Sequence, residues 1–265
     1  MLKTEMRNEA SRHIDKMDTL SMINLINQEN MNAVKAVEAA SEKIAEACDV
    51  VANAFENGGR LFYIGAGTSG RLGVMDAAEC PPTFGVQKGQ VVGIIAGGEK
   101  CMVQAAEKEE DDAMAGEMDL RKHELCDKDV VIGISASGGA SYVVGALEYA
   151  NRVGAYTVSL SSNADSPMER VAKLAIVTDT GAEVITGSTR MKSGTAQKLV
   201  LNMISTCAMI KTGKVYENMM INLRPSNQKL QGRMVRIVSE IKECDLVMAE
   251  QLLEEHNWNI RAAVE

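Results

Sequence analysis

The sequence predicts an α/β protein built on a doubly wound, five-stranded parallel sheet. Five short apolar runs are separated by stretches of helical character: LFYI (61–64), VVGII (91–95), VVIGI (130–134), YTVSL (156–160) and LAIV (174–177). Their apolar residues are continuous rather than strictly alternating, which is typical of strands buried on both faces. Strands that alternate with helices pair in parallel, and the ligands of such folds bind beyond the carboxyl ends of the strands.

Two helices are expected before the sheet. Apolar or small residues from Val34 to Phe55 recur at steps of three and four, which predicts a helix that Gly58 and Gly59 end. A shorter helix is expected over 20–28, with Thr19 as its N-cap. We expect the two to form a helical hairpin that also serves as a dimer surface.

The chain beyond the last strand is expected to be helical. One long helix is predicted over 188–211, and shorter helices follow a break at Pro225. We therefore divide the chain into an amino-terminal helical segment (1–57), a central domain (58–222) and a carboxyl-terminal helical cap (223–265).

Composition excludes several classes of protein. The 265 residues carry a net charge of −8, which argues against a nucleic-acid surface or an anionic-membrane binder. No run approaches the roughly 20 apolar residues of a membrane span, and no signal peptide is evident, so a cytoplasmic protein is expected. Six scattered cysteines without a CxxC pair indicate reduced thiols, and no zinc motif is present.

A glycine-rich loop follows the first strand. Its GAGTSG fits the GxGxxG spacing of a dinucleotide fold, in which a helix amino terminus meets a pyrophosphate. Such a site also needs an acidic residue at the end of the second strand, but VVGIIAGG closes with glycines and Glu99 lies beyond it. Nucleotide binding therefore stays open as an alternative that depends on glycine spacing alone.

Hydroxyl groups distinguish two loops at the strand ends. Thr68 and Ser69 follow Gly67 in the first loop, while Ser135 and Ser137 precede Gly138 in the second. Two such loops can surround a phosphate monoester with hydroxyl and backbone N–H donors. Ordinary helix N-capping by these serines is the alternative explanation.

Two glutamates are candidates for proton transfer. Glu79 precedes Cys80 and two prolines, so the helix is expected to stop near it, where the helix dipole would favour a protonated carboxyl. In the acidic stretch 97–116, the spacing of Val103, Ala106, Glu110 and Met114 places Glu110 on an apolar helical stripe. A shift of one residue would select Glu109 instead, and the spacing does not decide between them.

These strings resemble the bacterial N-acetylmuramic acid 6-phosphate etherases, members of the sugar isomerase (SIS) superfamily. The resemblance covers most of the chain. The matching segments include TEMRN, GAGTSGRLGVMDAAECPPTFG, the EKEEDD stretch, VVIGISASG and STRMKSGTAQK, of which ECPPTFG and STRMKSGTAQK are the most specific. It implies a SIS fold and cleavage of the D-lactyl ether of N-acetylmuramic acid 6-phosphate, which yields N-acetylglucosamine 6-phosphate and D-lactate in cell-wall recycling. The resemblance implies no metal and no organic cofactor.

The resemblance also implies residue roles. Glu79 is the acid that protonates departing lactate, and Glu110 is the base that takes the C2 proton. The sugar phosphate is expected to contact hydroxyls and glycines of both loops, together with two cations near the start of the long helix, supplied from a partner subunit. The implied contacts are Gly67, Thr68, Ser69, Ser135, Ser137, Gly138, Arg190 and Lys192. The expected partners are a small sugar phosphate and a second copy of the chain.

One departure from the family pattern lies in the second loop. Where etherases usually continue as SGRTPYV, this chain has SGGASYV, so Gly139, Ala140 and Ser141 replace an arginine, a threonine and a proline. A lost hydroxyl could remove a hydrogen bond of about 1.5 to 3 kcal/mol to a charged oxygen. The departure keeps a second hypothesis open, in which the protein is a catalytically weak or silent sugar-phosphate regulator like others of this superfamily.

Overall fold

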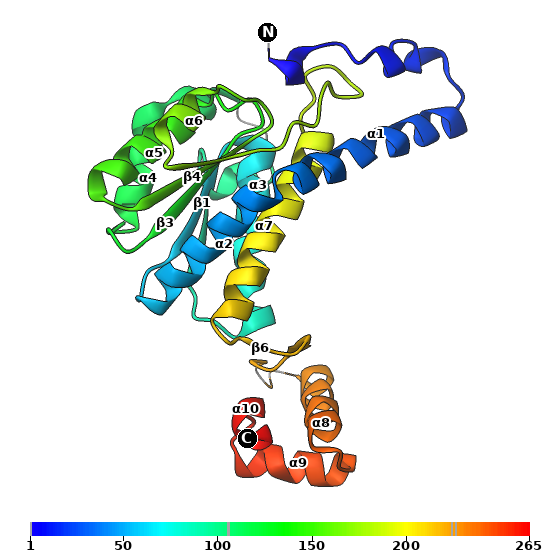
Figure 1. The fold of residues 1–265 in the computed structure, drawn as a ribbon. Coiled ribbons are helices and arrows are strands. Elements are labelled where there is room, and N and C mark those ends of the chain that lie inside the picture. The colour runs from blue at the N-terminus through cyan, green and yellow to red at the C-terminus, as the bar shows by residue number, and fades with distance from the viewer. Residues whose placement is uncertain (1, 105–106, 224, 226) are drawn as a thin grey trace.

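The computed structural model describes residues 2–104, 107–223, 225 and 227–265. Its centre is a five-stranded, all-parallel sheet with strand order β2-β1-β3-β4-β5 (Figure 1). The order runs outward in both directions from β1, which confirms the doubly wound prediction. The strands are β1 (Leu61–Gly65), β2 (Val91–Ile95), β3 (Val130–Ile134), β4 (Tyr156–Ser161) and β5 (Leu174–Val177).

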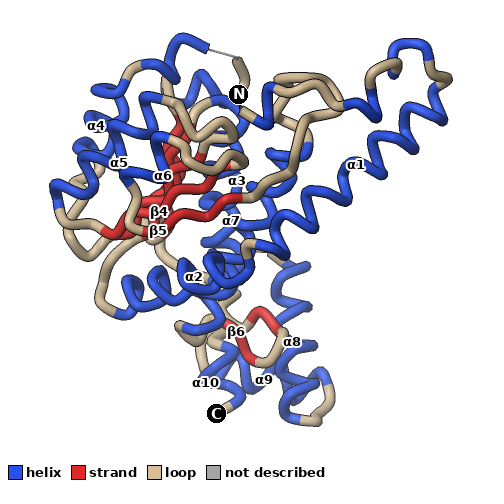
Figure 2. Tube along the Cα trace, turned by 45° about the horizontal axis from the view of Figure 1, so that its top comes forward, coloured by secondary structure: helices blue, strands red, loops and turns tan. Residues whose placement is uncertain are grey.

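Helices cover both faces of the sheet, so the domain has three layers (Figure 2). Alternate residues of each strand face opposite layers: Leu61 and Tyr63 join one apolar cluster, whereas Phe62 and Ile64 join the other. The first face carries α2 (Ser41–Glu56), α3 (Gly67–Phe84) and α7 (Lys192–Lys211). The second face carries α4 (Ala113–Lys122), α5 (Ser141–Val153) and α6 (Pro167–Val171).

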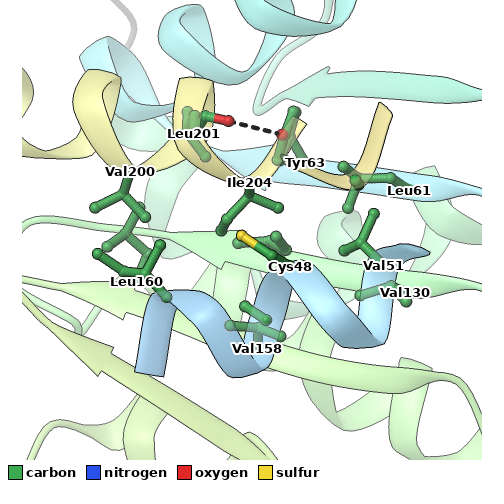
Figure 3. Close-up of a cluster of buried hydrophobic side chains, with 14 of the residues drawn as sticks. Cys48, Val51, Leu61, Tyr63, Val130, Val158, Leu160, Val200, Leu201 and Ile204 are labelled. Carbon is green, nitrogen blue, oxygen red and sulfur yellow. Dashed lines mark hydrogen bonds between the residues drawn. The ribbon is translucent and has the colours of Figure 1, made fainter. Parts of the chain in front are cut away.

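The first cluster joins segments far apart in the sequence (Figure 3). Cys48 and Val51 of α2 pack with Ile204 of α7 over the strands. The buried Tyr63 hydroxyl donates to the Leu201 carbonyl at 3.4 Å, which ties β1 to α7. Burial raises the pKa of Tyr63 well above its ordinary value, with the nearby Asp76 carboxylate adding to the effect.

The amino-terminal helices do not form the expected hairpin. Helix α1 (Thr19–Ala39) is followed after one residue by α2, and the two continue in roughly the same direction (Figures 1 and 2). The break lies at Ala40 rather than between 28 and 34, since α1 runs uninterrupted through those residues and they contain no glycine or proline. Asp18, not Thr19, is the N-cap and accepts from the Ser21 N–H at 3.1 Å.

Three short 3-10 turns precede α1, and two more lie between β2 and α4. They are η1 (Lys3–Glu5), η2 (Glu9–Ser11), η3 (Ile14–Lys16), η4 (Glu99–Met102) and η5 (Glu107–Asp111). In the described part of the chain, no helix combines the length and apolar character that crossing a membrane requires.

The carboxyl-terminal helices have an apolar cluster of their own. After the small antiparallel pair β6 (Val215–Tyr216) and β7 (Met219–Met220) come α8 (Gln228–Lys242), α9 (Leu246–Glu255) and α10 (Ile260–Val264). Met234, Val238 and Leu253 are fully buried in this cluster, and Trp258 packs against it. The helical extension is therefore present, while the boundaries at 57/58 and 222/223 stay a prediction.

Candidate active site

A cavity of about 250 Å³ lies at the carboxyl ends of β1 and β3. These adjacent strands end at Gly65 and Ile134, so the loops that follow them converge. The wall combines both loops with three segments that are distant in the sequence. It consists of Glu5, Ala66, Gly67, Thr68, Ser69, Glu110, Ile134, Ser135, Ala136, Ser137, Ala140, Gly187 and Thr189.

The second loop presents two hydroxyls side by side. The Ser135 and Ser137 Oγ atoms lie 3.3 Å apart. Each oxygen also accepts a backbone N–H at 3.2 Å, Ser135 from Gly138 and Ser137 from Gly139. These bonds fix the two oxygens. One serine hydroxyl donates to the other, and the remaining hydroxyl proton can turn toward a ligand, which suits an anion.

Gly138 has a structural role in this loop. Its φ is +75°, and a Cβ at this position would lie 2.4 Å from the Ser166 Cβ. No other residue fits there without displacing the chain. Gly138 therefore shapes the serine pair from behind and is absent from the described cavity wall.

The first loop holds its serine more tightly. Gly67 and Thr68 line the cavity at the start of α3, and the buried Ser69 hydroxyl donates to Gln197 Oε1 of α7 at 3.0 Å. The Ser69 oxygen keeps acceptor capacity, but its proton is already engaged. Gln197, which sequence reasoning missed, thereby positions this side of the cavity from a residue 128 positions away.

Glu110 lies in the cavity wall, although the reason expected from the sequence is wrong. The acidic stretch is not one helix, because Asp112 caps α4 by accepting the Ala115 N–H at 3.0 Å and the preceding residues form a 3-10 turn. There is no buried stripe either: Val103 is 87% and Met114 63% exposed, while Ala106 lies outside the described residues. Of the two alternatives, Glu110 faces the cavity, whereas the Glu109 side chain lies against Gly97.

Glu79 does not occupy the end of a helix. Helix α3 continues through Pro81 and Pro82 to Phe84 and ends at Gly85, whose N–H donates to the Pro81 carbonyl at 2.9 Å. Burial of Cys80 and Phe84 keeps the last turn helical in spite of the prolines. The exposed Glu79 is ten residues beyond Ser69, about 15 Å along a helix, and within one chain it is absent from the described cavity wall.

Lys192 contributes to the fold rather than to the cavity wall of its own chain. It is 1% exposed, and its ammonium contacts Glu29 of α1 at 2.6 Å and the Ala182 carbonyl at 2.7 Å. Burial opposes ionisation of Glu29, but hydrogen bonds from Lys192 and Asn8 outweigh it and lower the pKa of this carboxyl. Lys192 is also the first residue of α7, which the sequence placed at Ser188.

Arg190 lines a neighbouring depression that shares Thr68 with the cavity. The other residues of this depression include Leu72 and Lys198. A larger hollow of about 830 Å³ lies at the opposite end of α7, near Gly85 and Lys211. The Lys211 ammonium there contacts Asp49 at 3.0 Å, and that hollow contains no counterpart of the paired serines. Among the described residues, no group of three or more histidine, cysteine or acidic side chains could hold a metal ion.

Comparison with known proteins shows which family the chain belongs to. Residues 43–151 match the family model of the glucokinase regulatory protein N-terminal SIS domain, and residues 113–206 match the SIS domain. The N-acetylmuramic acid 6-phosphate etherase of Pasteurella multocida is 52% identical over 263 residues, which cover 99% of this chain and 87% of that protein. The chain belongs to the N-acetylmuramic acid 6-phosphate etherase family.

Other relatives support the same assignment. The N-acetylmuramic acid 6-phosphate etherase of Halalkalibacterium halodurans is 49% identical, over 99% of this chain and 88% of that one. A solved structure, a putative phosphosugar isomerase from Bacteroides fragilis, superposes with a TM-score of 0.58 over 77% of this chain and 98% of its own. At 20% identity that likeness shows a shared fold, and the predicted SIS fold is confirmed.

Proposed function

We propose that this etherase family member cleaves the D-lactyl ether of N-acetylmuramic acid 6-phosphate, giving N-acetylglucosamine 6-phosphate and D-lactate by elimination and water addition. The observation that carries the proposal is a cavity that combines Glu110 with the paired hydroxyls of Ser135 and Ser137. About half of the chain's residues are identical to those of N-acetylmuramic acid 6-phosphate etherases. The product sugar and lactate would feed cell-wall sugar recycling.

The serine end of the cavity is the proposed phosphate site. The described wall contains no lysine or arginine, so the phosphate would be held by neutral donors: the hydroxyls of Ser135, Ser137 and Thr68, and backbone N–H groups of the loops. Such donors suit a protein with a net charge of −8, because the anion is captured locally rather than by a basic surface.

Glu110 is the proposed base for the C2 proton. A carboxylate in the wall can accept a proton next to the sugar carbonyl, and a positioned base of this kind accelerates such a step by about 10²- to 10⁴-fold. Glu79 is the proposed acid for the departing lactate. Because Glu79 lies outside the cavity of its own chain, it would act in the cavity of a second subunit.

The protein is accordingly proposed to be a symmetric homodimer with sites shared between subunits. Arg190 keeps its proposed contact in this arrangement if dimerisation brings it to the partner's cavity. Lys192, buried and bonded to Glu29 and the Ala182 carbonyl, would act only by stabilising the fold of its own chain. A cytoplasmic location is proposed because all six cysteines are free thiols.

A sugar-phosphate regulator is the second candidate function. It is favoured by Ala140, which lines the cavity without offering a hydroxyl. The position of Glu110 in the same wall favours catalysis, because a silent binding site has no use for a base.

Incubation with N-acetylmuramic acid 6-phosphate, followed by enzymatic measurement of D-lactate, tests the proposal. The unmodified protein should release lactate, and Glu110→Ala and Glu79→Ala should not. Binding without release by the unmodified protein would establish the regulator instead.

Mixing the two inactive variants tests the shared site. After subunit exchange, activity should return to about a quarter of the unmodified level, because half of the dimers are mixed and one of their two sites is intact. Mixtures that stay inactive while exchange is verified would contradict the assignment of Glu79 to the partner's cavity.

A further inference from the structure

One buried side chain hydrogen-bonds the amino-terminal segment, residues 2–17, to the carboxyl end of the sheet. Asn163, which follows β4, accepts the Lys3 N–H through Oδ1 at 2.8 Å and donates from Nδ2 to Thr4 Oγ1 at 3.0 Å. Thr4 is fully buried and Asn163 is 4% exposed. The segment lies beside the loop that leads into α7, as Figure 1 shows, and the Ser11 hydroxyl donates to the Val184 carbonyl of that loop at 2.7 Å.

The same asparagine also holds the second cavity loop. Its Nδ2 donates to the carbonyl of Ala136 at 3.0 Å, and Ala136 stands between the two serines of the proposed phosphate site. One side chain therefore sets the distance between the amino-terminal segment and the serine loop. Asn163 is a positioning residue, because its contacts are with the two walls and not with the cavity itself.

The hydrogen bonds that Asn163 forms with Lys3 and Thr4 place the next residue, Glu5, in the cavity wall. A Cβ built on Gly187, on the same wall, would lie 3.4 Å from Glu5 Oε2. Among the described residues, the Glu5 carboxylate forms no hydrogen bond or ion pair, whereas the neighbouring Lys3 is paired with Asp179. The segment is thus held firmly while its carboxylate stays available to a ligand.

The cavity therefore has unlike sides. The serine loop offers hydroxyl and backbone N–H donors, which favour an anion, whereas Glu5 offers only acceptors and a negative charge. A carboxylate repels a phosphate and attracts the hydroxyl and amide N–H donors of a sugar. A phosphosugar in this cavity would be oriented by both effects at once.

We propose that Glu5 is a specificity-determining residue of the site, whose carboxylate accepts hydrogen bonds from hydroxyl or amide N–H groups of the sugar and keeps the phosphate at the serine loop. The inference rests on the proposed function in one respect, namely that the cavity binds a phosphosugar. It does not depend on lactate release.

Calorimetric titration of Glu5→Gln with N-acetylglucosamine 6-phosphate and with inorganic phosphate tests the inference. The sugar phosphate should bind about 10- to 100-fold more weakly, since a charge-assisted hydrogen bond is lost, while inorganic phosphate should bind equally well or more tightly. Glu9→Gln is the matched control, because Glu9 is an exposed carboxylate of the same segment that pairs with Arg12 outside the cavity. It should leave both affinities unchanged.

Three outcomes would overturn the inference: sugar-phosphate affinity of Glu5→Gln within twofold of the unmodified protein, an equal loss for both ligands, or no sugar-phosphate binding by the unmodified protein. If the unmodified protein binds the sugar phosphate without releasing lactate from the etherase substrate, catalysis fails and the role of Glu5 is still decided by the titrations.

Thr4→Val tests the role of the Asn163 hydrogen bonds, because it keeps the shape of the side chain and removes the Thr4 acceptor for Asn163. Sugar-phosphate affinity should fall several-fold in the unmodified background and change little in the Glu5→Gln background, because both changes remove the same contact. An equal loss in both backgrounds would show that the segment acts through something other than Glu5, against the inference.

Discussion

Polar side chains at the two ends of the parallel sheet differ in their surroundings. At the amino end, Asp129 stands just before β3 and is 1% exposed. Its carboxylate accepts the Arg60 backbone N–H at 2.8 Å, the Arg60 guanidinium at 2.7 Å and the Cys126 N–H at 3.0 Å. At the carboxyl end, Glu110, Glu5 and the serine pair face a cavity.

We assign Asp129 and Arg60 at the amino end to the stability of the fold, and the cavity at the carboxyl end to the proposed function. Burial alone would raise the pKa of Asp129, but the hydrogen bonds from Arg60 and Cys126 outweigh it and lower that pKa. Arg60 also donates to the His123 and Glu124 carbonyls and lies over the Phe62 ring, so its donors are engaged within the fold. Asp129 and Arg60 bond to one another within the fold, whereas the side chains named at the carboxyl end line a cavity that can admit a ligand.

The largest expected effect is on catalysis at the cavity. Glu110→Gln should reduce lactate release by about 10²- to 10⁴-fold with little change in thermal stability, because it removes the base and keeps the shape. Glu109→Gln is the control and should retain activity, since Glu109 lies against Gly97. Equal losses in the two variants would contradict the placement of Glu110 as the base.

The next effect is on stability at the opposite end. Asp129→Asn should lower the free energy of unfolding by about 1 to 3 kcal/mol, because buried hydrogen bonds to the carboxylate are lost while the Arg60 charge stays partly solvated. Lactate release per folded molecule should stay the same. Urea unfolding monitored by circular dichroism gives the first quantity, and activity at low temperature gives the second.

The same pair predicts a dependence on pH. A folded-state pKa lowered from its ordinary value means that Asp129 stabilises the protein above its unfolded pKa of about 4, and this stabilisation is lost as the pH falls through the folded value. The stability difference between the unmodified protein and Asp129→Asn should be full above about pH 5 and shrink below about pH 4. A difference that grows on acidification would contradict the assignment.

Removing one serine should have a smaller effect on the cavity. Ser137→Ala should weaken phosphosugar binding by about 10- to 100-fold, the loss of one hydrogen bond to a charged oxygen. Ser41→Ala, at an exposed serine that donates to the Glu38 carbonyl, should leave affinity unchanged. Unchanged affinity in Ser137→Ala, measured by titration, would count against the serine cradle.

The smallest expected effect comes from restoring a hydroxyl. Ala140 is the N-cap residue of α5 and provides no side-chain cap, while it also lines the cavity. Ala140→Thr should raise stability by about 1 kcal/mol if the hydroxyl caps the helix, or tighten phosphosugar binding if it faces the ligand. Thermal unfolding with and without N-acetylglucosamine 6-phosphate distinguishes helix capping from ligand contact. If Ala140→Thr lowers both the stability and the phosphosugar affinity, the cavity wall has no room for a larger side chain.

The sequence by itself determined the sheet and the location of the site. All five strands lie at the expected positions, because burial on both faces leaves a continuous apolar run that can be recognised locally. Parallel strands bring their carboxyl ends to one edge, so the convergence of the Thr68 and Ser137 loops followed from topology alone.

The tertiary structure alone decided which charged groups face the cavity. It directed Glu110 rather than Glu109 to the wall, paired Lys192 with Glu29, and brought Glu5 in through Asn163, 158 residues further along the chain. It also carried α3 past Pro81 and Pro82. Local periodicity encodes which face of an element is apolar, but a polar side chain's partner is chosen by packing between distant segments, which no local pattern records.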